Sequence, residues 1–142
     1  MVEQTVWHRG RLIDHVQLVV RDLAASRRFY EAILDVLGVP LERGEGYFFA
    51  DELFVTQGAE GTKDPLTGRC HLAFQAPDRE AVNRFYDAAL KAGGRDNGAP
   101  GLRAYHDDYY AAFVLDPDGN NIEAVHHGPA RRSAASVVIE SL

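Results

Sequence analysis

The sequence predicts an α+β domain built from two copies of one module, in which a strand, a helix and further strands follow each other. The chain has 142 residues, 46% of them apolar, which suits one globular domain with a single core. Shifted by 56 residues against itself, the segment 15–38 matches the segment 71–94 at 9 of 24 positions. Average residue usage gives roughly one or two such matches by chance. We therefore interpret the chain as an internal duplication.

The first copy is expected over residues 12–57. An apolar run at 13–20 predicts a strand, and Asp22 predicts the N-cap of the helix that follows, because its carboxylate can accept from free backbone N–H groups. Gly38 is expected to end this helix. The strands expected after the helix are residues 39–43, 47–50 and 53–57, the first of them weaker and the last two forming a hairpin.

The second copy is expected over residues 70–127 and repeats this order. Its first strand is predicted at 70–76, its helix after Asp78, and the end of that helix at the glycine pair 93–94. Two further strands are predicted at residues 111–115 and 122–125, on either side of a run rich in turn-forming residues at 116–121. Residues 58–69 are interpreted as a polar linker and residues 128–142 as a tail with no assigned element. The residues expected on the buried helix faces are Phe29, Ile33, Leu34 and Leu37 in the first copy and Val82, Phe85, Ala89 and Leu90 in the second.

Composition argues against several classes of partner. The formal net charge of −6 would repel nucleic acid and anionic lipid rather than attract them. The sequence has no apolar run near the ~18 residues that a membrane helix needs, and its first residues lack the apolar core of a signal peptide. Cys70 is the single cysteine, so an intrachain disulfide is impossible. We expect a cytoplasmic protein that contacts neither nucleic acid nor membrane.

Strand alternation indicates which side chains leave the helix-packed face. In the first strand, Val16, Leu18 and Val20 form one face, which places His15 and Gln17 on the other. By the same alternation, His71 lies opposite the helix in the second copy, and Glu123 can lie on that side in the last strand. Two imidazoles and one carboxylate leave open coordination positions on a divalent ion. His15, His71 and Glu123 are therefore candidate metal ligands.

An ordinary strand histidine is more often hydrogen-bonded or exposed than a ligand, and the duplicated position is what favours the metal hypothesis for His15 and His71. The spacing of the residues alone does not exclude the other histidines as metal ligands. These are His8, His106, His126 and His127.

Several segments resemble one known family. They are the strand 13–18, the pair Phe29-Tyr30, the strand start 71–74, and the segment 112–123, in which Asp-Pro-Asp-Gly is followed four residues on by a glutamate. Over residues 12–127 they resemble the vicinal oxygen chelate superfamily, which includes glyoxalase I, extradiol dioxygenases, fosfomycin-resistance thiol transferases and bleomycin-resistance proteins.

The resemblance implies two βαβββ modules that form a curled mixed sheet around a cavity, usually completed in a homodimer. It implies that His15, His71 and Glu123 hold a divalent metal ion, such as Fe²⁺, Mn²⁺, Ni²⁺ or Zn²⁺. With two neutral histidines, one glutamate leaves such an ion with a net charge of +1, so that it remains a useful Lewis acid. Glu123 is also the candidate catalytic residue.

The departures from the family pattern affect the expected reaction. Glyoxalase I enzymes carry a further glutamate at the end of the first module, where this chain has Thr56, or Gln57 if the register slips by one. Neither side chain titrates near neutral pH, so neither can act as a carboxylate base. The fosfomycin transferases carry a threonine where this chain has Gln17, and a lysine in a loop that here contains Arg103 and no lysine.

These observations predict a small metal-dependent enzyme for a small-molecule substrate that chelates the metal through vicinal oxygens, either a glyoxalase-type lyase or isomerase or a dioxygenase. Two alternatives stay open: a thiol transferase of the fosfomycin-resistance type, and a non-catalytic protein that sequesters a ligand in an aromatic groove, as bleomycin-resistance proteins do. The candidate substrate-binding residues are Gln17, Thr56, Arg103 and Tyr109. The aromatic residues that could line a groove are Tyr47, Phe49, Tyr105, Tyr109 and Tyr110.

Overall fold

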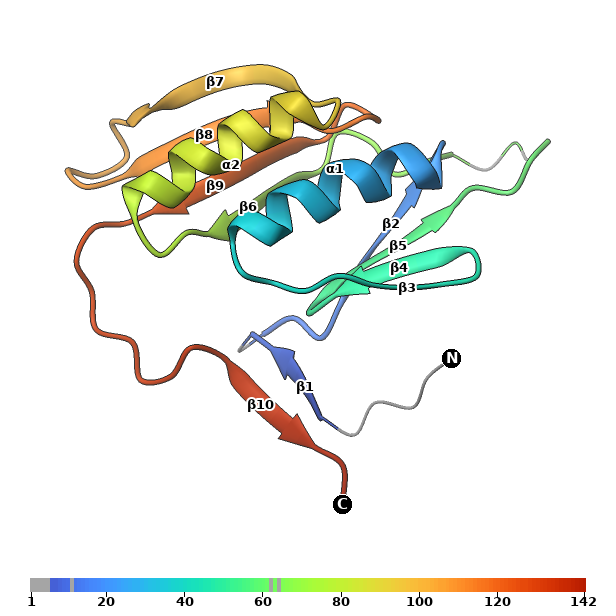
Figure 1. Ribbon diagram of the computed structural model, residues 1–142, viewed down its shortest axis with the longest axis horizontal. Coiled ribbons are helices and arrows are strands. Elements are labelled where there is room, and N and C mark those ends of the chain that lie inside the picture. Colours follow the sequence, from blue (N-terminus) through green and yellow to red (C-terminus); the bar gives the residue numbers. More distant parts are fainter. Residues whose placement is uncertain (1–5, 11, 62, 64) are drawn as a thin grey trace.

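Two four-stranded mixed sheets, each covered by one helix, make up the body of the protein (Figure 1). The computed structural model describes residues 6–10, 12–61, 63 and 65–142. The first module contains β2 (Val16–Val20), α1 (Leu23–Val36), β3 (Glu42–Gly44), β4 (Tyr47–Ala50) and β5 (Leu53–Gln57). The second contains β6 (His71–Gln75), α2 (Arg79–Lys91), β7 (Arg95–Leu102), β8 (Tyr110–Leu115) and β9 (Asn121–His126). The predicted α+β fold with two βαβββ modules is confirmed, although the sheets stay separate instead of closing into one.

The two sheets have the same topology, which is what a duplicated module predicts. Their strand orders are β2-β5-β4-β3 and β6-β9-β8-β7. In each sheet the first strand pairs in parallel with the last, and the other neighbouring strands are antiparallel. The two helices contact each other on the same side of the molecule. The faces of the sheets that the helices do not cover remain available for a site.

Both helices begin where their capping aspartates predict. The Asp22 carboxylate accepts from the Ala25 backbone N–H at 3.1 Å, and the Asp78 carboxylate accepts from that of Ala81 at 2.7 Å. Each bond satisfies a backbone donor that the first helical turn leaves free. At the other end, Gly38 has a φ of 75°, a left-handed conformation that glycine adopts without strain.

Strand alternation separates the core from the open faces largely as predicted. Leu18 and Val20 of β2 are fully buried against α1, together with Phe29 and Ile33. In β6, Leu72 and Phe74 also face the core but are only half-buried. One prediction was wrong: Leu90 of α2 is 38% exposed. The buried face of α2 is completed by smaller residues instead, including Ala81 and Ala89.

The turn between β8 and β9 is a buried hydrogen-bonded joint between the two modules. Its Asp116 is 1% exposed and accepts from the backbone N–H groups of Asp118 and Asn120 at 2.9 and 2.8 Å. It also accepts from the Asn120 amide at 2.9 Å and from the Tyr30 hydroxyl of α1 at 2.6 Å. Burial, followed by the Asp116 charge, raises the pKa of Tyr30 well above its usual value, so this hydroxyl remains a donor. Asp116 therefore ties α1 to the turn that precedes β9.

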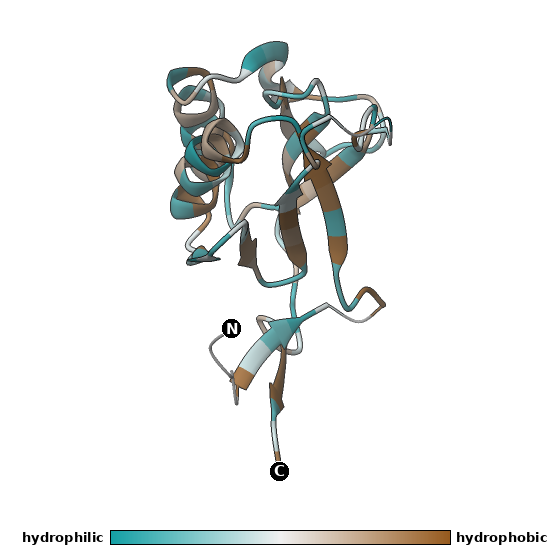
Figure 2. Cartoon of the chain, turned by 90° about the vertical axis from the view of Figure 1, so that its right-hand side faces the viewer, coloured by the Kyte–Doolittle hydropathy of each residue, from teal (hydrophilic) through white to brown (hydrophobic). Residues whose placement is uncertain are grey.

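Three strands were not predicted. Strand β7 has a glycine at 98 and a proline at 100, and its pairing with β8 shifts register twice, so no regular alternation marks it. β1 (Val6–Arg9) and β10 (Val137–Glu140) form an antiparallel pair with Trp7 opposite Ile139. The tail, to which no element was assigned, thus contains a strand that pairs near the other end of the chain. Figures 1 and 2 show this two-stranded sheet projecting from the body.

No helix in the described ranges is long and apolar enough to cross a membrane.

Candidate metal and substrate site

His71 and Glu123 meet on the open face of the second sheet. They stand at the start of β6 and in the middle of β9, which are parallel neighbours. The His71 Nε2 atom lies 3.1 Å from Glu123 Oε1. The glutamate is 1% exposed, whereas the histidine side chain is 50% exposed. Solvent therefore reaches this pair from the imidazole side.

The orientation of the His71 ring suits a metal ligand. Its Nδ1 atom lies 3.0 Å from the backbone oxygen of Asn121, and a carbonyl oxygen can only accept, so Nδ1 carries a proton and Nε2 is the nitrogen that faces Glu123. At 3.1 Å from the carboxylate, Nε2 needs a proton or a metal ion between the two groups. A carbonyl behind a metal-binding histidine is the usual way to fix the ring. The His71 Nε2 atom and the Glu123 carboxylate therefore suit a divalent cation as ligands.

Tyr109 holds the glutamate from the other side. Its hydroxyl donates to Glu123 Oε2. Burial, together with this hydrogen bond and the Glu123 charge, raises the pKa of Tyr109 to about 12. The phenol is therefore protonated at neutral pH and can donate throughout that range. Tyr109 therefore orients Glu123, which leaves Oε1 to face His71, and its predicted role in binding substrate stays a prediction.

We expect Tyr109→Phe to weaken metal binding by about 10- to 100-fold without unfolding the protein, because groups that orient a ligand have effects of this size. Competition against a chromophoric chelator measures the change, and circular dichroism checks the fold. Tyr105→Phe is the matched control, because its ring packs edge-on against Tyr109 with centroids 4.8 Å apart. An unchanged metal affinity in Tyr109→Phe would show that this hydrogen bond does not support a ligand.

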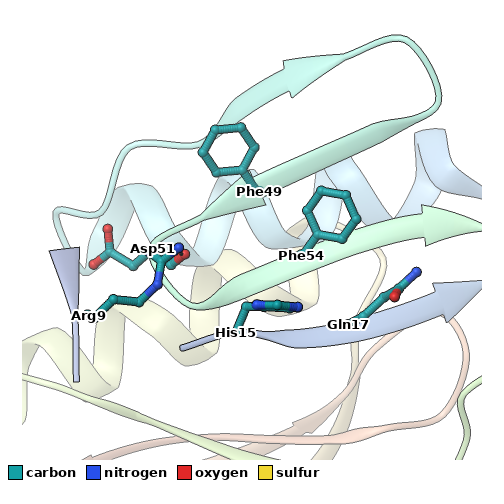
Figure 3. A pocket seen from close by; sticks show the side chains of 6 residues that line it. All are labelled: Arg9, His15, Gln17, Phe49, Asp51 and Phe54. Carbon is teal, nitrogen blue, oxygen red and sulfur yellow. Dashed lines mark hydrogen bonds between the residues drawn. The ribbon is translucent and has the colours of Figure 1, made fainter. Parts of the chain in front are cut away.

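His15 lies in a separate pocket on the open face of the first sheet (Figure 3). Its Nδ1 atom is 2.7 Å from Asp14 Oδ1. That hydrogen bond is the main cause that lowers the pKa of Asp14, so the carboxylate accepts and the ring again offers Nε2. The pocket has a volume of about 220 Å³. The residues that line it are Arg9, His15, Gln17, Phe49, Asp51 and Phe54.

The two candidate substrate-binding residues of the first sheet contact each other, and one of them, Gln17, lines the His15 pocket. The Gln17 amide donates to Thr56 Oγ1 at 3.0 Å. Gln57 points elsewhere, since its amide oxygen accepts from the backbone N–H of Leu23 at 2.9 Å and so caps α1 together with Asp22. Of the two registers left open by the sequence, the structure therefore places Thr56 beside Gln17 and takes Gln57 away from the open face.

Arg103 lies on the same side of the second sheet as His71. Its guanidinium is 5.3 Å from the centroid of the Phe113 ring, and that ring is stacked with His71 at 6.1 Å between centroids. The guanidinium also donates to the backbone oxygens of Gly101 and Ala99 at 2.9 and 2.7 Å. These bonds hold the end of β7 in place and fix Arg103 over the ring. The predicted role of Arg103 in binding substrate stays a prediction.

The candidate ligands are divided between the modules. Among the residues that the structure describes, no three His, Cys, Asp or Glu side chains come together as a metal site. The structure therefore joins His71 to Glu123 and leaves His15 with Asp14 in the other sheet.

The competing histidines have other partners. His8 bonds Ser136, His126 bonds the backbone oxygen of Ala76, and His106 bonds His127 at 2.9 Å. These pairings do not bring a carboxylate against the imidazole, as Glu123 does for His71. The position duplicated in the sequence therefore remains the best guide to the candidate metal ligands.

The predicted aromatic groove is split in the same way. Tyr47 stacks with Phe49 and Phe54 on the first sheet, with centroids 6.3 and 5.6 Å apart, and Tyr105 packs against Tyr109 on the second. The expectation for Tyr110 was wrong. Its hydroxyl donates to Asn83 of α2 at 2.7 Å, so it belongs to the helix side.

Two residues next to the candidate ligands were missed. Asp14 had a signal in the sequence, because a carboxylate directly before a candidate metal-binding histidine can orient its ring. Arg9 had none, since it lies outside the repeat, on a strand that pairs only with the distant β10 among the described strands.

Comparisons with known proteins agree with this fold. Residues 12–124 match the family model of the Glyoxalase/Bleomycin resistance protein/Dioxygenase superfamily. The chain is 30% identical over 128 residues to the uncharacterized protein YqjT of Bacillus subtilis, covering 80% of this chain and 97% of that protein.

Solved structures give the same result. A glyoxalase/bleomycin resistance protein from Albidiferax ferrireducens has a TM-score of 0.70 at 31% identity, over 82% of this chain and 99% of that one. The fosfomycin resistance protein FosX from Mesorhizobium loti has a TM-score of 0.56 at 20% identity, over 80% and 89% of the two chains. A glyoxalase I variant from Zea mays has a TM-score of 0.57 at 26% identity, over 80% of this chain and 45% of that one. The chain belongs to the glyoxalase/bleomycin resistance protein/dioxygenase superfamily.

Proposed function

We propose that this protein is a small enzyme that uses a divalent metal ion, held by His15, His71 and Glu123, to act on a small substrate with two neighbouring oxygens. Because the structure leaves His15 apart from the other two candidates, we propose that two subunits pair. Each site then takes His15 from one subunit and His71 with Glu123 from the other. The leading reaction class is a glyoxalase-type lyase or isomerase.

The observation that carries this proposal is that both imidazole rings are held in the same way, by an acceptor at Nδ1. The Nδ1 of His15 is engaged by the Asp14 carboxylate, and that of His71 by the Asn121 backbone oxygen. Each ring therefore offers Nε2, the atom that a metal would bind. Histidines whose other nitrogen is fixed by an acceptor are typical of metal sites. Two rings prepared in this way at duplicated positions argue against both being ordinary surface residues.

A bound divalent ion supplies a Lewis acid that stabilises negative charge on a chelating substrate oxygen. The chain's own groups then have distinct tasks. Glu123 supplies the anionic ligand, and Tyr109 holds it in position. Gln17 lines the His15 pocket and offers an amide for hydrogen bonds to substrate, and Thr56, which is bonded to Gln17, offers a hydroxyl.

Thr56 limits how a proton can move in the reaction. It is hydrogen-bonded to Gln17, the family resemblance assigns the additional glutamate of glyoxalase I to this residue or the next, and its hydroxyl does not titrate near neutral pH. This chain therefore cannot use a carboxylate at residue 56 to transfer a proton between neighbouring substrate carbons. Two imidazoles and one carboxylate also suit non-haem Fe²⁺, which makes dioxygenase the second candidate.

Metal content tests the proposal. Protein purified without a polyhistidine tag is incubated with Ni²⁺, Mn²⁺, Zn²⁺ or Fe²⁺, freed of excess metal and analysed by plasma mass spectrometry. We expect about one ion per chain, and His15→Ala or Glu123→Gln should each reduce it to less than about a tenth with the fold retained. His8→Ala, at an exposed histidine bonded to Ser136, is the matched control. A wild-type protein that retains none of the four metals would favour the ligand-sequestering class instead.

A further inference from the structure

Arg9 lies in the His15 pocket although it comes from outside the family match. It is the last residue of β1, whereas the family model begins at residue 12. Its partner across the two-stranded sheet is Val137 of β10. Figure 3 shows Arg9 beside Asp51 at one end of the pocket, with His15 and Gln17 along β2 and with Phe49 and Phe54 above them. This chain therefore uses strands near both of its ends to bring a cation to the pocket.

The Arg9 side chain is anchored, yet it has donors to spare. Its Nη1 atom donates to the backbone oxygens of His8 and Asp51 at 2.8 and 3.1 Å, which fixes the plane of the guanidinium. Its Nε atom is buried and, among the described residues, has no hydrogen-bond partner. It forms an ion pair with Asp14, whose Oδ2 atom is 3.6 Å away, which is beyond hydrogen-bond length. Of the five N–H donors of a guanidinium, two are used at Nη1 and the one at Nε is buried, so the two at Nη2 can still hold a ligand.

The surroundings restrict which ligand would fit. The Arg9 side chain is 20% exposed, so an anion beside its guanidinium would be partly shielded from water. The Asp14 carboxylate is already hydrogen-bonded to His15, and Asp51 meets Arg9 through its backbone oxygen. Phe49 and Phe54 supply an apolar aromatic wall to the pocket. A planar cation next to such a wall suits a carboxylate attached to an apolar or aromatic body.

We propose that Arg9 is a substrate-binding residue that takes the carboxylate of a 2-oxo or 2-hydroxy acid with an apolar or aromatic side chain. The placement of the neighbouring substrate oxygen at His15 rests on the proposed function. The pairing of Arg9 with the carboxylate does not, because it uses only groups of the pocket. A different role would be indirect, with Arg9 steadying Asp14 and thereby the His15 ring.

Two probes that differ in charge test the proposal. Phenylpyruvate is an aromatic 2-oxo carboxylate, and 1-phenylpropane-1,2-dione is a neutral aromatic compound with vicinal oxygens. Both are titrated by calorimetry into zinc-loaded and metal-free protein, for the wild type, Arg9→Gln and Asp14→Asn. Arg84→Gln, at an exposed arginine of α2, is the matched control for the loss of one positive charge.

We expect Arg9→Gln to weaken phenylpyruvate binding roughly 10- to 100-fold, as for a lost charge-assisted hydrogen bond, and to change dione binding less than about 2-fold. The dependence on Arg9 should persist in metal-free protein. A failure to bind zinc would therefore overturn the proposed function alone, and the titrations of the metal-free protein would still decide the Arg9 proposal. The proposal is overturned if phenylpyruvate binds neither form of the wild type, or if Arg9→Gln leaves its affinity unchanged. It is also overturned if Arg9→Gln and Asp14→Asn both weaken the binding of zinc and of both probes to a similar extent. That result would mean that Arg9 acts indirectly, by steadying Asp14 and the His15 ring.

Discussion

A mixed dimer of one His15→Ala subunit and one subunit that carries both His71→Ala and Glu123→Gln is expected to bind metal, although neither variant binds it alone. In such a dimer, one site combines the intact His15 of the second subunit with the intact His71 and Glu123 of the first, whereas the other site has none of the three. The expected content is therefore half that of the wild-type dimer. The reason is geometric: His71 and Glu123 lie 3.1 Å apart, while His15 stands on the other sheet with Asp14.

The measurement needs two peptide tags without histidine, one on each chain, so that tandem purification isolates the mixed dimer before metal analysis. A wild-type chain paired with a chain that carries all three substitutions is the control. If ligands come from both subunits, this control dimer has no complete site and stays empty. If each chain builds its own site, the control holds half the metal and the first mixed dimer holds none. Light scattering that finds only monomers at working concentration would also contradict the paired arrangement.

The elements that the sequence predicted well are those whose signals are local. Asp22 and Asp78 mark helix starts because a capping side chain acts within three residues of itself. Strands β4 and β5 were predicted at their observed bounds because two short apolar-rich runs flank a polar pair of residues. The alternation of side chains along β2 and β6 placed His15 and His71 opposite the helices, where the structure has them. Of the site, local pattern could therefore predict which face each candidate ligand occupies.

What could not be predicted depends on contacts between distant segments. β1 and β10 are each too short and ordinary to be recognised, and they become strands only because residues 6–9 pair with residues 137–140. Arg9 enters the pocket through that pairing. The separation of His15 from Glu123 likewise follows from how the two sheets pack, about which a strand's own sequence carries no information. Tertiary placement, and not propensity, decided these features.

The second large effect is expected at the turn between β8 and β9. Asp116→Ala should lower the free energy of unfolding by about 3 kcal/mol or more, because it leaves buried donors without an acceptor. For a domain of this size, that corresponds to a fall in Tm of roughly 10 °C. The donors concerned are the backbone N–H groups of Asp118 and Asn120, the Asn120 amide and the Tyr30 hydroxyl.

Urea denaturation followed by circular dichroism measures the loss. Tyr30→Phe removes one donor and keeps the acceptor, so it should cost about 1 kcal/mol. Asp107→Ala, at an exposed aspartate in the loop before β8, should change the stability by less than about 0.5 kcal/mol. An Asp116→Ala variant as stable as Asp107→Ala would show that the turn does not join the modules.

The same variant should also impair the proposed metal site, because the turn sets the position of the strands that carry His71 and Glu123. The Asn120 side chain accepts from the Cys70 backbone N–H at 3.0 Å, and the Asn121 backbone N–H donates to the Cys70 oxygen at 2.8 Å. These bonds fix the start of β6 against the start of β9, one residue before His71. At temperatures where Asp116→Ala is still folded, we therefore expect weaker metal binding than in Asp107→Ala. A folded Asp116→Ala variant with full metal affinity would show that the joint stabilises the fold without positioning the ligands.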